Sequence, residues 1–466
     1  MAAFRRRSRI QSPDQETNPS DFTDLRAFNA RKLDILYINP SAVGKNVYSY
    51  ILDQSEALKG PCDTLKSVEK KVDKVQGMYR INTTIGQQPI EMTVKVVNSW
   101  NHSRFTEEDP FKTKKLKESI EAGRINAQDC LTQIKIPDSY LGLDAFANEV
   151  IIGTIVDQFA RTDGFPQLYH PVIAGLKCGS KKVILSPSFY GTLLQVGTVG
   201  VVQDQFGREK FRDLIVNPKL GKQGSQVMVK PEITLGVIQQ VTSLISFLQK
   251  KLLFVHADLR INNILYHDRP YRGRIGNFQI DCPITVSVSG FANSSLTITR
   301  TRSSPQDPIQ EVRIFNEAKG SNYLLKYTDS YSFKSERHSF CVHTGENNSE
   351  CGEANWWQLP SQLDWRLVLW TGHSGLPFYK SYDLYIFLVS MLMTPQYYYS
   401  IVTTKSGERL FNLMWLDTER KKIIKRLTDA HRKEVKLSTI FGILEGISIR
   451  CDLLEMIEKY LSSVQL

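Results

Sequence analysis

The chain has 466 residues, of which 41% are apolar and 23% are charged, and its formal net charge is +11 at pH 7. This composition is that of a globular protein with two or three domain-sized units, and it argues against a fibrous or largely disordered chain. The basic excess favours acidic partners, but it is spread along the sequence. Because the densest basic run, 420–436, is typical of a solvated helix face, no stable nucleic-acid complex is expected.

The cysteines and the apolar runs indicate in which cellular environment the protein is expected. There are seven cysteines, an odd number, and no CxxC pair. This pattern argues against a disulfide framework or a zinc ribbon and favours a reducing, intracellular environment. The first residues lack the apolar stretch of a secretory signal, and the longest apolar run, 384–393, is too short to cross a bilayer, so no transmembrane segment is expected.

The first part of the chain predicts a tail, a small sheet and a helix. Residues 1–30 are polar and basic and are expected to form a disordered tail. Two strand-like runs between 78 and 97 predict an antiparallel hairpin, with Lys95 inside the second run. Apolar residues at helical spacing predict a helix over 144–160, with Glu149 beside the apolar stripe. Lys95 therefore either reaches solvent at an edge or meets an acid, and Glu149 is either that acid or a boundary residue in solvent.

The middle of the chain predicts one long helix, 234–249, which leads into the stretch HADLRINNIL at 256–265. A polar loop between buried segments costs desolvation unless its groups are bonded, and such loops often carry function. The alternative is a turn in which Asp and Asn bond their own backbone. Further strands are predicted at 171–176, 183–185, 276–280 and 284–288.

The remainder of the chain predicts an insertion followed by helices. Residues 293–360 are long, polar and irregular, which indicates an insertion or a functional loop. Residues 381–393 predict a buried helix with one acid, Asp383, at its start. The last 70 or so residues follow a helical pattern.

The stretch HADLRINNIL resembles the catalytic loop of protein kinases, H-x-D-L-(K/R)-x-x-N-I-L, and it is the most specific signal in the chain. Met92–Lys95 resembles the kinase V-A-I-K strand, and Glu149 falls where that family places the partner of this Lys. Tyr382–Tyr385 resembles the start of the kinase helix whose Asp steadies the catalytic loop. The resemblance covers roughly 65–400 and is most like the serine/threonine kinases of large DNA viruses such as iridoviruses.

This resemblance implies an α+β, bilobal protein kinase-like fold, in which a small antiparallel-sheet lobe with one helix precedes a larger, mainly helical lobe. The two lobes would span 31–186 and 187–466, with the insertion near 293–360 in the second. It also implies ATP and Mg²⁺ or Mn²⁺ as cofactors and a protein substrate from the virion or the host. The expected location is the host cytoplasm or the virion.

The resemblance also assigns roles to individual residues. Lys95 and Gly77 would bind the phosphates of ATP, and Glu149 would fix Lys95. Gly77 is the one glycine that remains of the family's Gly-rich loop. Asp258 would act as the catalytic base, and Arg260 would contact the γ-phosphate.

Two alternatives stay open for the metal. Asn263 would supply one oxygen to Mg²⁺, a cation that prefers oxygen ligands. In the favoured alignment Gly290, followed by Phe291, stands where the family has the metal-binding Asp of D-F-G. In the other alignment Asp281 supplies the carboxylate, but Pro283 then removes a backbone donor where the chain turns.

Three functions follow, in order of preference. The first is a divergent, active serine/threonine kinase, which the loop at 256–265 together with Lys95 and Glu149 favours. The second is a pseudokinase that acts as a binding or scaffold module, which Gly290 and the reduced Gly-rich loop favour. The third is a basic virion or nucleic-acid-binding protein in which the loop match is accidental.

Overall fold

The computed structural model of the chain describes residues 59–68, 78–85, 88–97, 140–143, 145–179, 181–197, 214–216, 228–299, 311–316, 356–358, 382–415, 417–433, 448–450 and 453–463. The predicted tail at 1–30 and the candidate phosphate-binding residue Gly77 lie outside the described residues. Helices and mainly antiparallel sheets alternate along the chain, so the predicted α+β class is confirmed.

The helices and strands have the following bounds. The helices are α4 (Lys59–Val68), α8 (Ala145–Thr162), α9 (Leu193–Gly197), α10 (Pro231–Leu252), α13 (Tyr382–Leu392), α14 (Pro395–Val402), α15 (Lys405–Met414), α16 (Asp417–Arg432) and α18 (Leu453–Ser463). The strands are β1 (Met78–Ile85), β2 (Gln88–Val97), β3 (Tyr140–Leu143), β4 (Ala174–Cys178), β5 (Lys181–Pro187), β6 (Gly191–Thr192), β7 (Ile215–Val216), β8 (Met228–Val229), β9 (Ile264–His267), β10 (Tyr271–Ile275), β11 (Phe278–Cys282), β12 (Thr285–Val288), β13 (Ser295–Thr299), β14 (Glu311–Asn316), β15 (Trp356–Gln358) and β16 (Ser448–Arg450).

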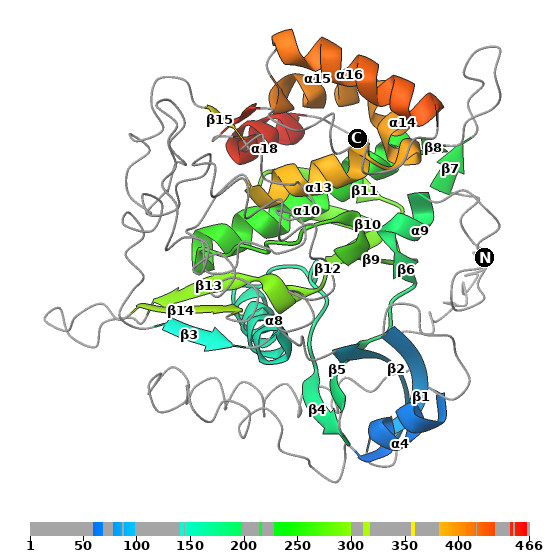
Figure 1. Ribbon diagram of the computed structural model, residues 1–466, viewed down its shortest axis with the longest axis vertical. Coiled ribbons are helices and arrows are strands. Elements are labelled where there is room, and N and C mark those ends of the chain that lie inside the picture. Colours follow the sequence, from blue (N-terminus) through cyan, green and yellow to red (C-terminus); the bar gives the residue numbers. More distant parts are fainter. Residues whose placement is uncertain are drawn as a thin grey trace, which may run out of the picture.

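A four-stranded sheet, in the order β1-β2-β5-β4, lies at one end of the molecule, and α14, α15 and α16 lie at the other (Figure 1). β1 and β2 form the predicted hairpin, with Met78 opposite Lys95. Ile90, Met92 and Val94 alternate into an apolar cluster on one face of this sheet. Because side chains alternate along a strand, Lys95 points to the opposite face.

The helix that precedes the stretch HADLRINNIL is longer than predicted. Pro231 occupies its first turn, where the missing N–H costs nothing and the fixed φ favours helix. α10 ends at Leu253, which adopts the left-handed conformation with φ 45°. The helix packs in the main apolar core against α13, α14 and α18, so it delivers the following loop from a rigid support.

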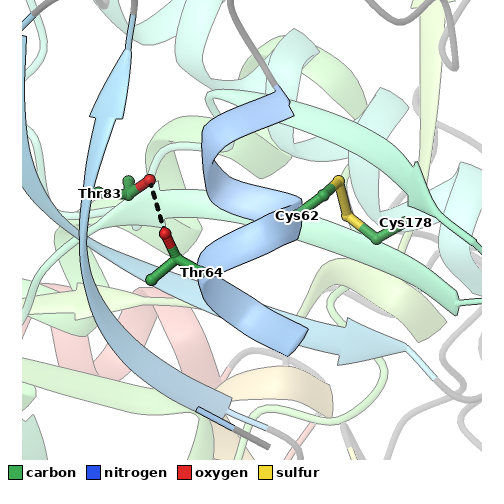
Figure 2. The surroundings of a disulfide bond; sticks show 4 residues. All are labelled: Cys62, Thr64, Thr83 and Cys178. Atoms are coloured by element: carbon green, nitrogen blue, oxygen red, sulfur yellow. Dashed lines mark hydrogen bonds between the residues drawn. A yellow bond between two sulfur atoms is a disulfide. The ribbon is translucent and has the colours of Figure 1, made fainter. Parts of the chain in front are cut away.

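One disulfide corrects the prediction from the cysteine pattern. Cys62 on α4 is bonded to Cys178 in β4, with 5.2 Å between their Cα atoms (Figure 2). Thr64 on the same helix donates a hydrogen bond of 3.2 Å to the hydroxyl of Thr83 in β1. The two contacts fasten α4 to two strands of the sheet. The sequence did not reveal the pairing because the cysteines are 116 residues apart and no local spacing marks them.

We expect the variant Cys178→Ser to have a free energy of unfolding about 2–4 kcal/mol below that of the wild type, because a closed loop restricts the unfolded chain. Urea denaturation of both proteins, with and without a thiol reductant, measures the effect. The reductant should destabilise the wild type and leave the variant unchanged. Equal sensitivity of the two proteins to reductant would show that the bridge does not stabilise the fold.

The region after the stretch HADLRINNIL departs from the prediction. A strand is predicted at 276–280. Instead, Gly276 adopts φ 54° in the turn that reverses the chain between β10 and β11, and only 278–280 belong to a strand, β11. Residues 293–360, predicted to be irregular, contain β13, β14 and β15. β14 pairs with β3, more than 160 residues earlier in the chain, and a partner so distant leaves no local signal.

Candidate functional site

Lys95 and Glu149 meet between β2 and α8. Lys95 Nζ lies 2.6 Å from Glu149 Oε1 and 2.8 Å from Oε2. The Glu149 side chain is 5% exposed and that of Lys95 is 31% exposed. A buried carboxylate thus holds a cation that remains partly open to solvent.

Asp383, at the start of α13, holds the loop at 256–263 through its backbone. Its Oδ2 accepts a hydrogen bond of 2.7 Å from the N–H of His256, and its Oδ1 accepts one of 2.9 Å from the N–H of Ala257. Ala257 has φ 63°, a conformation that residues with a Cβ adopt at a cost. Burial raises the pKa of Asp383 to about 7, and the two N–H bonds oppose this rise. This one carboxyl group therefore pairs two successive N–H groups at the strained point of the loop.

Asp258, Arg260 and Asn263 converge within the loop. Asn263 Nδ2 donates to the carbonyl of Asp258 at 2.7 Å and to its Oδ2 at 3.1 Å. Arg260 Nε lies 2.6 Å from Asp258 Oδ1, although neither atom makes an aligned hydrogen bond, so this contact is one of charge. The structure thus brings together the three loop residues that the sequence singled out. Arg260 shields the carboxylate in this arrangement.

Gly290, and not Asp281, lies beside Asn263. A Cβ on Gly290 would fall 2.9 Å from Asn263 Oδ1, and Gly290 has φ 84°, which favours glycine. The preceding Ser289 donates its N–H to the carbonyl of Asn263 at 2.8 Å. The ring of Phe291 lies 5.7 Å from the ring of His256. These contacts place the Ser289–Phe291 stretch against the loop, as the Gly290 alignment requires.

Asp281, the acid of the other alignment, lies in β11 with its side chain 60% exposed. Its Oδ1 lies 3.2 Å from Arg272 Nε on the neighbouring strand β10. No contact between described residues joins Asp281 to Asn263. The proposed metal pair Asn263 and Asp281 is therefore not assembled, because Asp281 lies in the β10–β11 hairpin and Asn263 lies in the loop before β9.

His256 connects the loop to the Ser289–Phe291 stretch. Its Nδ1 accepts the N–H of Asp258 at 3.3 Å, so its Nε2 carries the proton that it donates to the carbonyl of Ser289 at 2.9 Å. Burial lowers the pKa of His256 to about 4; Asp258 acts against this shift, and Lys95 and Arg260 add to it. His256 therefore ties Asp258 to the stretch after β12 through its two ring nitrogens.

Asn148 is a residue of this site that the sequence did not reveal. Its Nδ2 donates to the carbonyl oxygens of Ser294 at 2.8 Å, Ala292 at 3.1 Å and Phe291 at 3.3 Å. The helix that presents Glu149 is thereby tied to the segment after Gly290. The sequence contains one indication of this role: Asn148 is a polar residue on α8, a helix that is buried on almost every side.

His170, which follows α8 and lies near the site, is buried, and neither ring nitrogen has a hydrogen-bond partner among the described residues. Burial lowers its pKa to about 3, and the charges of His267 and Lys95 add to this effect. Burial likewise lowers the pKa values of His256 and His267 to about 4 each. A His whose folded-state pKa lies below 6.5 stabilises the fold above pH 6.5, and this contribution is lost as the pH falls toward the folded-state pKa.

We therefore expect the free energy of unfolding to fall as the pH is lowered from about 6.5 to about 4, since each buried His contributes about 1.4 kcal/mol per pH unit there. Asp383 acts in the opposite direction over this range, because its folded-state pKa is raised, but one acid is outweighed by three histidines. The variant His170→Leu removes one of the three, so its slope should be smaller by about 1.4 kcal/mol per pH unit. Urea denaturation at several pH values measures both slopes. Parallel curves for the variant and the wild type would contradict this account of His170.

Neither a protein-family model nor a curated protein matches the chain in sequence. Within the described ranges, no helix has the length and apolar content needed to cross a bilayer. In the same part of the chain, no group of three or more His, Cys, Asp or Glu side chains lies in an arrangement that could hold a metal ion.

Proposed function

We propose that the chain is a serine/threonine protein kinase-like phosphotransferase with a bilobal, kinase-like fold. The observation that carries the proposal is the double hydrogen bond from the backbone of His256 and Ala257 to Asp383. This contact fixes a strained loop that presents a carboxylate, a guanidinium and an amide side by side, and rigid presentation of such groups is what positioning catalysis needs. The lobes would meet near residue 187, and the protein would act on virion or host proteins in the host cytoplasm or the virion.

Each residue has a role that fits its environment. Lys95, held by Glu149, neutralises phosphate charge. Asp258 orients the acceptor hydroxyl and takes its proton. Arg260 now shields Asp258. It would move to the γ-phosphate when substrates bind, which uncovers the base at the moment when its own charge is needed.

The residues present fit ATP with Mg²⁺ or Mn²⁺, with few ligands from the protein. Asn263 uses its Nδ2 on Asp258, so its Oδ1 is the oxygen that remains for a metal. Asp258 offers a carboxylate beside it. Magnesium commonly takes one or two protein ligands and completes its shell with phosphate oxygens and water. The bound nucleotide supplies the phosphoryl group for transfer.

Gly290 favours a second candidate function, that of a pseudokinase serving as a binding module. It offers no carboxylate at the position beside Asn263, and Asp281 is engaged with Arg272 instead. Nor can an acid be added there without movement, since a Cβ at Gly290 meets Asn263 Oδ1 at 2.9 Å. The kinase proposal therefore requires catalysis with one carboxylate fewer than the family pattern.

Incubation of the purified chain with γ-labelled ATP, Mg²⁺ or Mn²⁺ and a basic protein substrate tests the proposal. Label transferred to serine or threonine supports the kinase function. The variant Lys95→Met serves as the control, because it keeps the length of the side chain and removes the charge. Absence of transfer, together with no change in melting temperature on addition of ATP and metal, would overturn the proposal. A melting shift without transfer would favour the pseudokinase.

A further inference from the structure

A pocket with a volume of about 890 Å³ lies apart from the Lys95–Asp258 site. It is bounded by the segment after α8, by α10, by the turn between β10 and β11, and by α18. The rings of Phe165 and Phe247 stack at its wall with their centroids 4.3 Å apart. Ile275 and Phe278 line it as well, so its lining includes a continuous aromatic and aliphatic patch.

Two of the cations that line the pocket form no ion pair with an acid among the described residues. Lys250 contacts Glu458 at 3.5 Å, and Lys251 contacts Asp163 at 2.7 Å. Arg274 and Lys459 also line the pocket, and neither forms an ion pair with an acid among the described residues. Glu455 is a third acid of the lining, beside Asp163 and Glu458, so the recess combines an apolar patch with four cations and three acids.

Three walls of the pocket come from segments that are connected in the chain to residues of the Lys95–Asp258 site. Asp163–Pro166 follow α8, the helix that presents Glu149. The Lys250–Lys251 pair ends α10, a few residues before His256. The β10–β11 turn lines the pocket as well. Along the chain, its two strands lie between β9, which follows Asn263, and β12, which precedes Gly290. A ligand in the pocket therefore lies against the ends of α8 and α10, the helix that carries Glu149 and the helix that leads into the loop at 256–263.

We infer that this pocket binds an extended segment of the protein substrate, one with a large apolar or aromatic side chain next to acidic residues. The apolar side chain packs on Phe165 and Phe247, and the carboxylates meet Arg274 and Lys459. Because the pocket is separate from Asp258, the segment is a docking element and not the phosphorylated sequence itself. Its assignment to a substrate rests on the proposed kinase function, whereas its binding does not.

Fluorescence anisotropy with labelled peptides tests the inference. The probe is the peptide EEDFLEE, and its comparison peptides are KKKFLKK and EEDAAEE. We expect saturable binding of the probe at up to millimolar concentration, and much weaker binding of both comparison peptides. Failure of the probe to bind in this range, or equal binding of all three peptides, would overturn the inference.

Two matched variants separate the pocket from the general basic charge of the chain. The double variant Arg274→Glu with Lys459→Glu should weaken binding of the probe roughly tenfold or more. The control Lys421→Glu with Lys425→Glu makes the same change of charge on the exposed face of α16, and it should alter binding less than about twofold. Equal weakening by the two variants would overturn the inference. The milder variant Phe247→Leu keeps an apolar side chain and should also weaken binding, because it removes the stacked ring.

The outcomes distinguish this inference from the proposed function. Binding of the probe needs neither ATP nor transfer, so it should persist in Asp258→Asn. A protein that transfers phosphate but does not bind the probe leaves the kinase function standing and overturns the pocket. A protein that binds the probe but transfers nothing keeps the pocket as a partner-binding site and overturns the assignment to a substrate.

Discussion

The variant Asp258→Asn should lower the rate of phosphate transfer about 10²- to 10⁴-fold, the range that a positioned general base contributes. The amide keeps the shape of the carboxylate but cannot take a proton from the acceptor hydroxyl. The amide also places an NH₂ group opposite either Asn263 Nδ2 or Arg260. Both of these are donors, so one contact of the loop is lost. We expect the fold to survive, because the backbone of the loop is held by Asp383 and not by this side chain.

Asp281→Asn is the matched control for this measurement. It makes the same chemical change at the acid that the sequence offered as an alternative metal ligand, and that acid lies exposed in the β10–β11 hairpin against Arg272. Its transfer rate should equal that of the wild type. Rates measured at saturating ATP and metal compare the three proteins. Loss of activity in Asp281→Asn would restore Asp281 to the site, and unchanged activity in Asp258→Asn would remove Asp258 from it.

The sequence was sufficient for those parts of the fold whose signals are local. The β1–β2 hairpin, α8, α10 and α13 each repeat apolar residues at the period of their own structure, and all four are present. The partners of β3 and β14 lie far apart in the chain, and the disulfide joins Cys62 to Cys178 across 116 residues. Pairings of that kind depend on the closure of long loops, which no short window of sequence encodes.

The candidate site shows the same division. Asp258, Arg260 and Asn263 fall within one short loop, so their spacing alone placed them together. The contact between Asp383 and the loop spans about 127 residues and was expected only from the resemblance to kinases. Asn148 was missed because nothing in a helix sequence says which carbonyl oxygens will approach an amide. The two alignments around Gly290 could be separated only by seeing which stretch lies against Asn263.

The variant Asp383→Ala should lower the free energy of unfolding by about 2–6 kcal/mol, because it leaves two buried N–H groups unpaired at about 1–3 kcal/mol each. Asp383 is fully buried, and its oxygens are the partners of the His256 and Ala257 amides. Without them the left-handed conformation of Ala257 has less to hold it, so the loop should also lose its order. Urea denaturation measures the stability, and amide hydrogen exchange at His256 and Ala257 measures the loop.

Asp383→Asn refines this test because it retains one carbonyl oxygen for one of the two N–H groups and turns its own NH₂ toward the other. Its loss of stability should be smaller than that of Asp383→Ala. The sign with pH is also fixed: burial raises the folded-state pKa of Asp383 to about 7, so its contribution is largest in acid and falls as the pH rises from about 4 to about 7. The difference in free energy of unfolding between the wild type and Asp383→Asn should therefore narrow over this interval.

Asp281→Ala, which removes an exposed Asp, is the control and should lower the free energy of unfolding by less than about 0.5 kcal/mol. A similar cost for the buried and the exposed acid would mean that Asp383 does not hold the loop.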